Sequence, residues 1–384
     1  MTARTTPRRV LVAHPGGELY GSDRVMLESA IGFREAGWEV DAILGFDGPL
    51  AAELLAAGAR VRIHGIPVLR KNLLTPTGLV RFAVESARAL PALVRTIRAA
   101  KPDAVYVSTL TIPLWIIAAR LCRRPVLCHV HEAETGGKAI VRRGLVAPLL
   151  LARGLVANSA FSADVASASF SRLAKRIVVV DNAVVGPTIA TPPRTFVTDG
   201  LTVAYVGRLS PRKGVDLVLD AVIAANAAGE RTTLSIIGST FAGYEWYEEQ
   251  LRQRAGQSGI EDRIEWIPFA ADIWPILGRV DVLVVPSRLP EPFGNTAVEG
   301  VLAARPVIAA DIGGLPEAVE GYRSAQLVEA DSVAGIVDAL LRVRTQWPRF
   351  AAAAVTDTGL ADERHSPARY RAAMARELNA LVRV

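Results

Sequence analysis

Two glutamates separated by seven residues mark the most informative segment, Val282–Glu299 (VLVVPSRLPEPFGNTAVE). An apolar run predicted to be a buried strand leads into a loop rich in proline and glycine, and this loop carries Glu291. Asn295 or Thr296 is expected to cap the following helix, whose first turn would contain Glu299. Carboxylates accept hydrogen bonds from sugar hydroxyls, and a helix N-terminus favours phosphate. The segment therefore indicates a site for a phosphorylated sugar. The alternative is structural: Glu291 is then only an acid in a loop, and Glu299 only stabilises its own helix through the helix dipole.

A basic turn lies earlier in the chain, in Val203–Gly214 (VAYVGRLSPRKG). Arg208, Arg212 and Lys213 directly follow a predicted strand, and Gly207 and the final glycine let backbone amides approach a ligand. Cationic donors concentrated just past a strand end suit a diphosphate. The turn is not a Walker loop, because its second glycine follows the lysine instead of preceding it. A solvated basic turn is the structural alternative.

The basic turn and, later in the chain, the acidic segment together resemble the corresponding motifs of the retaining GT-B glycosyltransferases of family 4. The spacing Glu291-x7-Glu299 matches the acidic signature of that family, and Gly207-Arg208 with Lys213-Gly214 matches its phosphate-binding turn. The stretch Gly313-Gly314-Leu315-Pro316-Glu317 resembles the segment that follows them. The resemblance covers most of the chain, and its motifs are densest in the second half.

The resemblance implies a role for each matching residue. Arg208 and Lys213 would hold the donor diphosphate and stabilise the departing nucleoside diphosphate, and Glu291 would contact hydroxyls of the donor sugar. Glu299 would contact the ribose, and backbone amides at Phe293–Thr296 would line the sugar and the phosphate. The donor-binding residues implied are Gly17, Gly207, Phe293, Gly294, Asn295, Thr296 and Glu299.

The chain contains no Asp-x-Asp motif. This agrees with the metal independence of the family, in which cationic side chains do what a divalent ion does elsewhere. The resemblance therefore implies that the only co-substrate is a nucleoside-diphosphate sugar, with no metal and no cofactor.

The first predicted strand is followed by a loop with three glycines, His14–Asp23 (HPGGELYGSD), which resembles the first glycine-rich loop of the family. The resemblance implies that Gly17 approaches the donor phosphates and that Gly16, Tyr20 and Gly21 contact the acceptor. The glycine spacing does not match the dinucleotide fingerprint Gly-x-Gly-x2-Gly. A plain tight turn is the structural alternative.

Two histidines end another predicted strand in the segment His129-Val130-His131-Glu132. They would share one face of the strand, but no Cys/His cluster completes a zinc site. The resemblance instead implies that His131 hydrogen-bonds the donor sugar or assists at the reacting centre. Glu132 stands where the family often has aspartate, so its role stays open. The catalytic residues implied are His131, Arg208, Lys213 and Glu291.

Two further segments lie near the predicted strand ends of the first half. Asn158-Ser159 is a weaker match to a turn of the family. Asp181-Asn182-Ala183-Val184 stands where the family usually has Asn-Gly-Val-Asp, so a ligand role for this segment is doubtful.

Short β-branched runs alternate with longer amphipathic segments along the chain, which predicts parallel sheets covered by helices on both faces. The helical segments include Ser22–Ala36, capped by Ser22 or Asp23, as well as Asp216–Ala228 and Glu245–Ala255. The predicted strands are Val10–Ala13, Val40–Leu44, Val61–His64, Ala104–Val107, Pro125–Val130, Leu155–Ala157, Ile177–Val180, Val203–Gly207, Leu234–Gly238, Ile264–Pro268, Val282–Pro286, Val307–Ala310 and Gln326–Val328.

The strand series is interrupted at residues 186–200 (GPTIATPPRTFVTDG), which contain three prolines and no helical period. The fold class expected is α/β, with two Rossmann-like αβα domains that face each other across a cleft, the GT-B arrangement. We expect an acceptor-binding domain at 1–186, a linker at 187–200 and a nucleotide-sugar-binding domain at 201–360. A C-terminal helix at 361–384 has apolar spacing suited to packing back on the N-terminal domain or across the other lobe.

Composition limits the class of protein. The 384 residues are 51% hydrophobic and 21% charged, which excludes global disorder. Residues 1–190 carry 24 basic and 14 acidic residues, against 20 and 24 in the rest, so the first half suits an anionic partner. Two cysteines allow no disulfide framework, and no stretch resembles a secretory or membrane-spanning segment, so a cytoplasmic protein is expected.

Residues 70–101 are strongly basic, with Glu85 as their single acid. Arg81, Arg88 and Arg95 recur every seven positions and would share a helical face, although Pro91 interrupts the pattern. With nearby apolar residues, the segment suits peripheral contact with anionic lipid on the inner face of the membrane; a solvated face is the alternative. The basic residues are Arg70, Lys71, Arg81, Arg88, Arg95, Arg98 and Lys101.

The function expected is transfer of a sugar from a nucleoside diphosphate to an acceptor hydroxyl with retention, in polysaccharide, glycolipid or glycosylated-metabolite synthesis. The acceptor class stays open among glycans, lipid-linked molecules and small molecules. A nicotinamide-dependent oxidoreductase would need the missing dinucleotide fingerprint. A non-catalytic nucleotide-sugar-binding protein would keep the same phosphate contacts and differ only in turnover. Nucleic-acid binding is not expected, because aromatics are 6% and no recognition motif is present.

Overall fold

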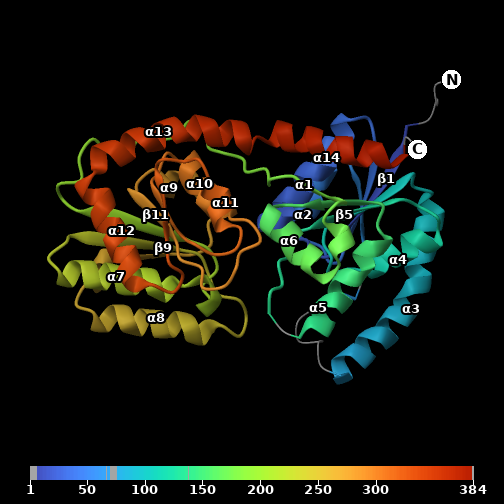
Figure 1. Cartoon of the computed structure of the whole chain (residues 1–384), viewed down its shortest axis with the longest axis horizontal. Helices are drawn as coiled ribbons and strands as arrows, with labels where there is room; N and C mark the ends of the chain where they lie inside the picture. The colour runs from blue at the N-terminus through green and yellow to red at the C-terminus, as the bar shows by residue number, and fades with distance from the viewer. Residues whose placement is uncertain (1–6, 66, 70–75, 137, 383–384) are drawn as a thin grey trace. The chain divides into compact units, whose positions relative to one another are not determined.

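The computed structural model describes residues 7–65, 67–69, 76–136 and 138–382. The chain forms two compact units (Figure 1). The N-terminal unit consists of Met1–Ala183 together with Pro367–Val384, and the C-terminal unit of Val184–Ser366.

The N-terminal unit has a seven-stranded sheet in the order β3-β2-β1-β4-β5-β6-β7, and all its strand pairs are parallel. Its strands are β1 (Arg9–His14), β2 (Glu39–Leu44), β3 (Arg60–Ile63), β4 (Ala104–Val107), β5 (Val126–Val130), β6 (Gly154–Ala157) and β7 (Ile177–Val179). Its helices are α1 (Gly21–Glu35), α2 (Pro49–Ala56), α3 (Pro76–Ala100), α4 (Leu114–Leu121), α5 (Ala139–Val146), α6 (Ala160–Ser169) and α14 (Pro367–Val382).

Alternate residues of each strand pack on opposite faces of this sheet, as the two-residue period of a strand requires. Val10 and Val12 of β1 lie in a buried cluster with α1 and the C-terminal helix α14. Leu11 and Ala13 lie in the cluster on the other face, with α3 and α4. Helix α14 runs along α1 (Figure 1), so the C-terminal segment returns to the N-terminal unit.

The C-terminal unit has a six-stranded parallel sheet in the order β10-β9-β8-β11-β12-β13. Its strands are β8 (Leu201–Val206), β9 (Thr232–Ile237), β10 (Ile264–Ile267), β11 (Val282–Val285), β12 (Val307–Ala310) and β13 (Ala325–Val328). Its helices are α7 (Val215–Ala227), α8 (Glu245–Gln257), α9 (Trp274–Leu277), α10 (Asn295–Leu302), α11 (Leu315–Val319), α12 (Val333–Thr345) and α13 (Trp347–Arg364).

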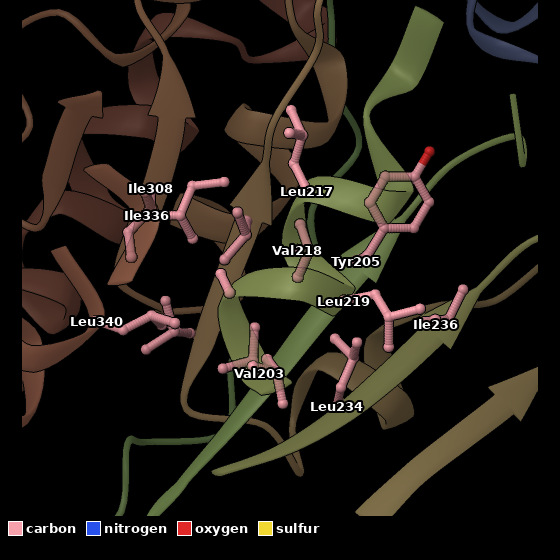
Figure 2. Packing of buried hydrophobic residues seen from close by; sticks show 14 of the residues in the cluster. Val203, Tyr205, Leu217, Val218, Leu219, Leu234, Ile236, Ile308, Ile336 and Leu340 are labelled. Atoms are coloured by element: carbon pink, nitrogen blue, oxygen red, sulfur yellow. The ribbon is translucent and has the colours of Figure 1, made fainter. Parts of the chain in front are cut away.

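The core of the C-terminal unit is built from the inward-facing residues of its central strands. Val203 of β8 and Leu234 of β9 meet Leu217 of α7 and Ile336 of α12 in one apolar cluster (Figure 2). A second cluster covers the other face of the sheet and includes residues of α10 and α11. Burial on both faces leaves the carboxyl ends of the strands as the place where polar loops collect.

Every predicted strand is present, and the sheets are parallel, so the α/β fold class is confirmed. The prediction that all of them are buried was wrong for β3 and β7, whose residues are largely exposed because these strands form the two edges of the sheet. The expectation that Pro91 interrupts its helix was also wrong, because α3 continues through this residue. Proline removes one amide donor from the helix, and the buried Leu93 and Ile97 hold the part of α3 that follows it against the core.

The segment between the two sheets differs from a free linker. Residues 186–200 form no helix or strand, as expected, but they belong to the C-terminal unit. Arg194 donates to both carboxylate oxygens of Asp281 (2.8 and 2.6 Å), and Trp347 Nε1 donates to the Arg194 carbonyl (2.9 Å). The chain therefore passes between the units at Ala183–Val184 and not at 186. The expected start of the last helix at 361 also differs, because position 361 belongs to α13 and the last helix, α14, begins at Pro367.

Candidate active site

Glu291 lies in the loop after β11, where the backbone of a second loop fixes it. The carbonyl of Glu291 accepts a hydrogen bond from the Gly314 amide (2.7 Å), and Glu291 forms an isolated parallel bridge with Gly313. A Cβ on Gly313 would lie 2.6 Å from the Glu291 carbonyl oxygen, so only glycine permits this approach. The Gly313-Gly314 motif of the sequence thus has a structural role: it supports the loop that presents Glu291.

The carboxylate of Glu291 is buried, with 8% of the residue exposed, and collects three polar groups. Its Oε1 lies 2.8 Å from Lys213 Nζ and 3.2 Å from an Arg212 guanidinium nitrogen, and it accepts a hydrogen bond from Ser287 Oγ (2.8 Å). Burial by itself raises the pKa of Glu291, but the charges of Lys213 and Arg212 outweigh it and hold the pKa below its usual value. The site therefore contains an ionised carboxylate bracketed by two cations.

The backbone positions these cations by joining the loops after β8 and β11. Gly214 has a φ of 68°, and a Cβ there would collide with the Pro286 carbonyl oxygen, so the glycine is required for the loops to pack. The Arg288 amide donates to the Arg212 carbonyl (2.9 Å), and the Arg288 guanidinium binds Asp216 at the start of α7 (2.6 Å). This contact between the two loops places Lys213 beside Glu291.

Arg208 lies at the start of the loop after β8, in an aromatic environment. Its guanidinium carbon is 3.9 Å from the ring centroid of Phe241, and its carbonyl accepts a hydrogen bond from Tyr205 OH (2.8 Å). Gly207, with which the turn begins, packs against Gly238 at the end of β9. A cavity of about 440 Å³ adjoins the turn and shares Arg212 with the Glu291 cluster. It is lined by Ser210, Pro211, Arg212, Phe241, Tyr244, Arg288 and Leu289.

The helix that follows Glu291 begins differently from the prediction. The N-cap of α10 is Gly294, no side chain caps the helix, and Asn295 and Thr296 are its first two residues. Glu299 is the fifth residue of α10, beyond the first turn, and is half-buried. The prediction that Asn295 or Thr296 caps this helix was therefore wrong. Gly294 takes the N-cap position, which glycine also favours.

Phe293 is 2% exposed and belongs to the apolar core, with its ring 5.7 Å from that of His365. The ring of Phe293 is therefore not available to a ligand. The first amides of any helix lack a carbonyl partner four residues earlier within that helix, and this property favours an anion at a helix start.

In the N-terminal unit, a buried hydrogen-bonded chain joins β1, α1 and β4. His14 Nε2 lies 2.7 Å from Asp23 Oδ1, and His14 Nδ1 lies 2.6 Å from Ser108 Oγ. The Ser108 hydroxyl donates to the Ala13 carbonyl (3.1 Å), and the other carboxylate oxygen of Asp23 accepts the Tyr20 amide (3.0 Å). Both ring nitrogens of His14 therefore face acceptor atoms of fixed side chains.

Close packing explains two glycines of the first loop. A Cβ on Gly16 would lie 2.8 Å from Asp23 Oδ1, and one on Gly17 would lie 2.5 Å from the Phe46 carbonyl oxygen. Tyr20, which is 38% exposed, is the N-cap of α1, and Gly21 is the first residue of that helix. The expected cap at Ser22 or Asp23 was wrong in position, although Asp23 does bind the helix start through the Tyr20 amide.

His129 and His131 lie against each other at the end of β5, with ring centroids 3.8 Å apart. His129 Nδ1 lies 2.9 Å from Tyr106 OH and 3.4 Å from Tyr370 OH of α14. Burial lowers the pKa of His131 to about 3, a shift to which the neighbouring His14 adds and which Asp23 opposes. Burial likewise lowers the pKa of His129, so both imidazoles are neutral at physiological pH.

Glu132, whose role the sequence left open, turns toward its own backbone and the β4 loop. It accepts hydrogen bonds from the Thr109 hydroxyl, the His131 amide (3.1 Å) and the Leu110 amide (3.4 Å). Burial raises the pKa of Glu132 despite these donors. Within the described ranges, no group of three or more histidine, cysteine, aspartate or glutamate residues is placed to hold a metal ion.

The structure therefore brings together Arg212, Lys213 and Glu291 in one unit. In the other unit it brings together His14, His129 and His131. Sequence reasoning missed Asp23, Ser108 and Ser287 as members of these clusters. The alternation of side chains predicts that Ser108 lies on the same face as Tyr106, but its contact with His14 requires knowing that β1 and β4 are neighbours.

Two family models match successive parts of the chain. Residues 21–188 match the model described as "Glycosyl transferase 4-like domain", and residues 200–346 match "Glycosyl transferases group 1". Together the matched segments cover most of the sequence.

Two curated relatives each match less than half of this chain. The lipopolysaccharide core biosynthesis mannosyltransferase LpsB of Rhizobium meliloti (strain 1021) is 30% identical over 153 residues, which are 39% of this chain and 43% of that protein. A D-inositol 3-phosphate glycosyltransferase of Mycobacterium marinum is 37% identical over 145 residues, 36% of this chain and 30% of that protein. The matches thus span less than half the length of these relatives.

The solved structure of Anabaena Alr3699/HepE in complex with UDP has a TM-score of 0.77, covers 97% of this chain and 100% of its own, and is 21% identical. This likeness shows the fold and confirms the predicted GT-B class. With both models of one family matched in succession, the chain belongs to the group 1 glycosyl transferases, the family 4 enzymes that its motifs resemble.

Proposed function

We propose that the protein transfers a sugar from a nucleoside-diphosphate donor to an acceptor hydroxyl, with retention of anomeric configuration. The observation that carries the proposal is the ionised Glu291 carboxylate held between Lys213 and Arg212 beside a helix start. Sugar hydroxyls donate to carboxylates, and diphosphates bind guanidinium and ammonium groups, so one cluster serves both halves of the donor.

The cations would act on the leaving group. In the resting structure Lys213 is paired with Glu291, and a bound diphosphate would offer Lys213 and Arg208 a stronger anionic partner than a single carboxylate. As the glycosidic bond breaks, negative charge develops on the diphosphate, and fixed cations lower the energy of that state. The leaving phosphate would take the acceptor proton, so no protein nucleophile is required.

His131 would contribute a hydrogen bond and not a proton. Its pKa of about 3 keeps the imidazole uncharged, so it does not serve as a general acid near neutral pH. A neutral imidazole still donates through one nitrogen and accepts through the other.

The proposal includes transfer without a metal ion, and it leaves the nucleotide base of the donor to be identified. A thermal-shift screen of UDP, GDP, ADP and dTDP and their common sugars, with and without EDTA, tests both. A ligand at ~100 times its dissociation constant adds ~2.7 kcal/mol to stability, which such a screen detects. Stabilisation by one nucleotide that EDTA leaves unchanged supports the proposal, and stabilisation by NAD(P) alone would replace it with the oxidoreductase. NMR of the product anomeric proton then tests retention, and absence of turnover would leave a binding protein.

The relatives point to a glycan or inositol-containing acceptor, because LpsB is named for lipopolysaccharide core biosynthesis and others for D-inositol 3-phosphate. Synthesis of a cell-surface polysaccharide, a glycolipid or a glycosylated metabolite would fit either class.

Helix α3 supports a peripheral membrane contact as part of this proposal. Val80 and Val84 are exposed (65% and 45%), and the helical period places Arg81, Arg88 and Arg95 beside them on the same exposed face. Leu93 and Ile97 are buried on the opposite face, so the apolar pair is not needed for the core. Arg70 and Lys71, the first basic residues of the predicted segment, lie outside the described residues. Across the described ranges, no helix has both the length and the apolarity to span a membrane.

A further inference from the structure

The end of β9 and the loop that follows it are bound through the backbone to the residues on both sides of Arg208. The Gly207 amide donates to the carbonyl of Ile237, the last residue of β9 (3.0 Å). The Leu209 amide donates to the carbonyl of Ser239 in the loop that leads to α8 (3.1 Å). The backbone of Arg208 is therefore fixed from both sides, and only its side chain keeps rotational freedom.

The Arg208 side chain lies against the ring of Phe241, which belongs to the same loop after β9. The guanidinium carbon lies over this ring, 3.9 Å from its centroid, well within the ~6 Å range of a cation–π contact. Arginine makes such contacts through the flat face of its guanidinium, so the N–H donors in the guanidinium plane stay directed at other groups. An ion pair uses these donors instead, as Asp216 does for Arg288 (2.6 and 2.7 Å). The ring therefore orients Arg208 through contacts that a phosphate does not need.

The packing of the apolar core does not account for the place of Phe241. The residue is 41% exposed, and neither apolar cluster of the C-terminal unit includes it. Phe241 also lines the cavity of about 440 Å³ that shares Arg212 with the Glu291 cluster. The ring thus lies at the edge of the candidate active site, with its contact directed at a cation of that site.

We propose that Phe241 is a positioning residue, which holds the Arg208 guanidinium in the orientation that binds the oxygens of a diphosphate. The role of Arg208 itself rests on the proposed function. A free arginine side chain has several rotatable bonds, and ordering them when a ligand binds costs conformational entropy. A guanidinium already placed by a ring is ordered before the ligand arrives, so this cost does not reduce the affinity. The competing interpretation is that the ring stacks directly on the nucleotide base.

Two substitutions separate the aromatic contact from the bulk of the side chain. Phe241→Leu keeps an apolar group and removes the ring, so we expect calorimetric titration to show diphosphate affinity lower by about five-fold, or about 1 kcal/mol. The probes are inorganic pyrophosphate, UDP, GDP, ADP and dTDP. Phe241→Trp keeps a ring face for the cation, so its affinity should stay within about two-fold of the wild type. Phe196→Leu is the matched control, because this phenyl is 70% exposed in the same unit, and its affinity should be unchanged.

A double-substitution cycle tests whether Phe241 acts through Arg208. We expect Phe241→Leu to weaken pyrophosphate binding in the wild-type background and to have no further effect in an Arg208→Ala background. Equal losses in both backgrounds would overturn the proposal, because the ring would then act without the arginine. A loss for nucleotides but not for pyrophosphate would also overturn it, since that result indicates direct stacking on the base.

The wild-type protein in the same titrations keeps this proposal apart from the proposed function. If it binds a diphosphate and Phe241→Leu binds that diphosphate equally well, the positioning role is wrong and the donor site stands. If the cycle shows coupling while the wild type transfers no sugar, the positioning role stands and the transferase function fails. If the wild type binds none of the diphosphates, both are overturned.

Discussion

Glu291 and Asn158 are both more than nine-tenths buried at the carboxyl end of a parallel sheet, yet their surroundings differ in kind. Oε1 of Glu291 has a cation at 2.8 Å, a second at 3.2 Å and a hydroxyl donor at 2.8 Å. Oδ1 of Asn158 has no partner among the described residues. The C-terminal unit thus holds its charges preassembled, whereas the N-terminal unit keeps an unmet hydrogen-bonding capacity.

The difference follows from the charge of the two side chains. A buried carboxylate requires counter-ions already fixed in place, and a diphosphate site gains from the same fixed cations. A buried amide oxygen without a partner destabilises the fold far less than an unpaired charge does, so the fold tolerates it. The charged residues of the C-terminal unit are therefore where a substitution should change function most.

Removing the charged cluster should have the largest effect. On the proposed function, Lys213→Ala or Glu291→Ala would remove a contact to the donor, and loss of one such contact typically costs ~3–4 kcal/mol, or ~10²–10³ in rate. Turnover with the identified donor measures the loss, and circular dichroism checks that the fold is retained. Arg254→Ala is the matched control, because Arg254 forms an exposed ion pair with Asp220 (2.7 Å) and should leave turnover unchanged. Near-normal transfer by both site variants would remove these residues from the mechanism.

The glycine that lets the two loops join is the next place to break the cluster. Gly214→Ala puts a side chain at φ 68° against the Pro286 carbonyl, so we expect unfolding free energy lower by about 2–4 kcal/mol and reduced turnover from a displaced Lys213. Gly229→Ala is the control, since its φ is 89° but no atom lies within 4 Å of the added Cβ. It should cost only about 1 kcal/mol by urea denaturation and leave turnover intact. Equal losses in the two variants would mean that the loop contact is unimportant.

How far the sequence predicts these features depends on the range of the interactions. Strands such as Ala104–Val107 were located from apolar β-branched runs, because both faces of a parallel sheet are buried. The exposure of β3 and β7 escaped prediction, since edge position depends on strand order. The N-cap at Gly294 also escaped, because three successive residues there are all acceptable caps.

Candidate residues were identified where the pattern is local in sequence, and contacts between distant segments were missed. Lys213 and Glu291 were identified from their own loops, and they meet because β8 and β11 are neighbours in the sheet. The chain from Asp23 through His14 to Ser108 joins residues up to 94 positions apart, and none of them carries a sequence signal for the other two. The unpaired Asn158 oxygen is invisible to sequence reasoning, because it is the absence of a contact.

The pH dependence of stability tests whether the N-terminal unit holds the imidazole of His131 in its neutral form. His131 has a pKa of about 3 when folded and an ordinary value near 6.5 when unfolded, so between these values the unfolded chain binds a proton that the folded one does not. Unfolding free energy therefore falls as pH drops from 6.5 toward 3, by at most about 1.4 kcal/mol per pH unit for this residue. His129, whose pKa is also lowered, adds a change of the same sign.

Urea denaturation at pH 7.5, 6.5, 5.5 and 4.5 measures this slope for the wild-type protein and for His131→Gln. The variant should be less sensitive to acid, while its stability difference from the wild type should stay constant above pH 7, where the folded and unfolded histidines are both mostly neutral. Parallel curves throughout would show that His131 is not held neutral by its surroundings.

The smallest effect expected concerns the basic face of α3, where the N-terminal unit would meet a charged surface. Arg81 is already paired with Glu85 (2.8 Å), so Arg88 contributes more to attraction of anionic lipid. Arg88→Ala should weaken binding to phosphatidylserine-containing vesicles by about 1 kcal/mol, or roughly five-fold, and added salt should weaken it further. Arg172→Ala makes the same charge change at another exposed position of this unit and should have little effect. Equal losses in the two variants would mean that net charge draws the protein to lipid, and no binding by the wild type at low salt would leave α3 a solvated helix.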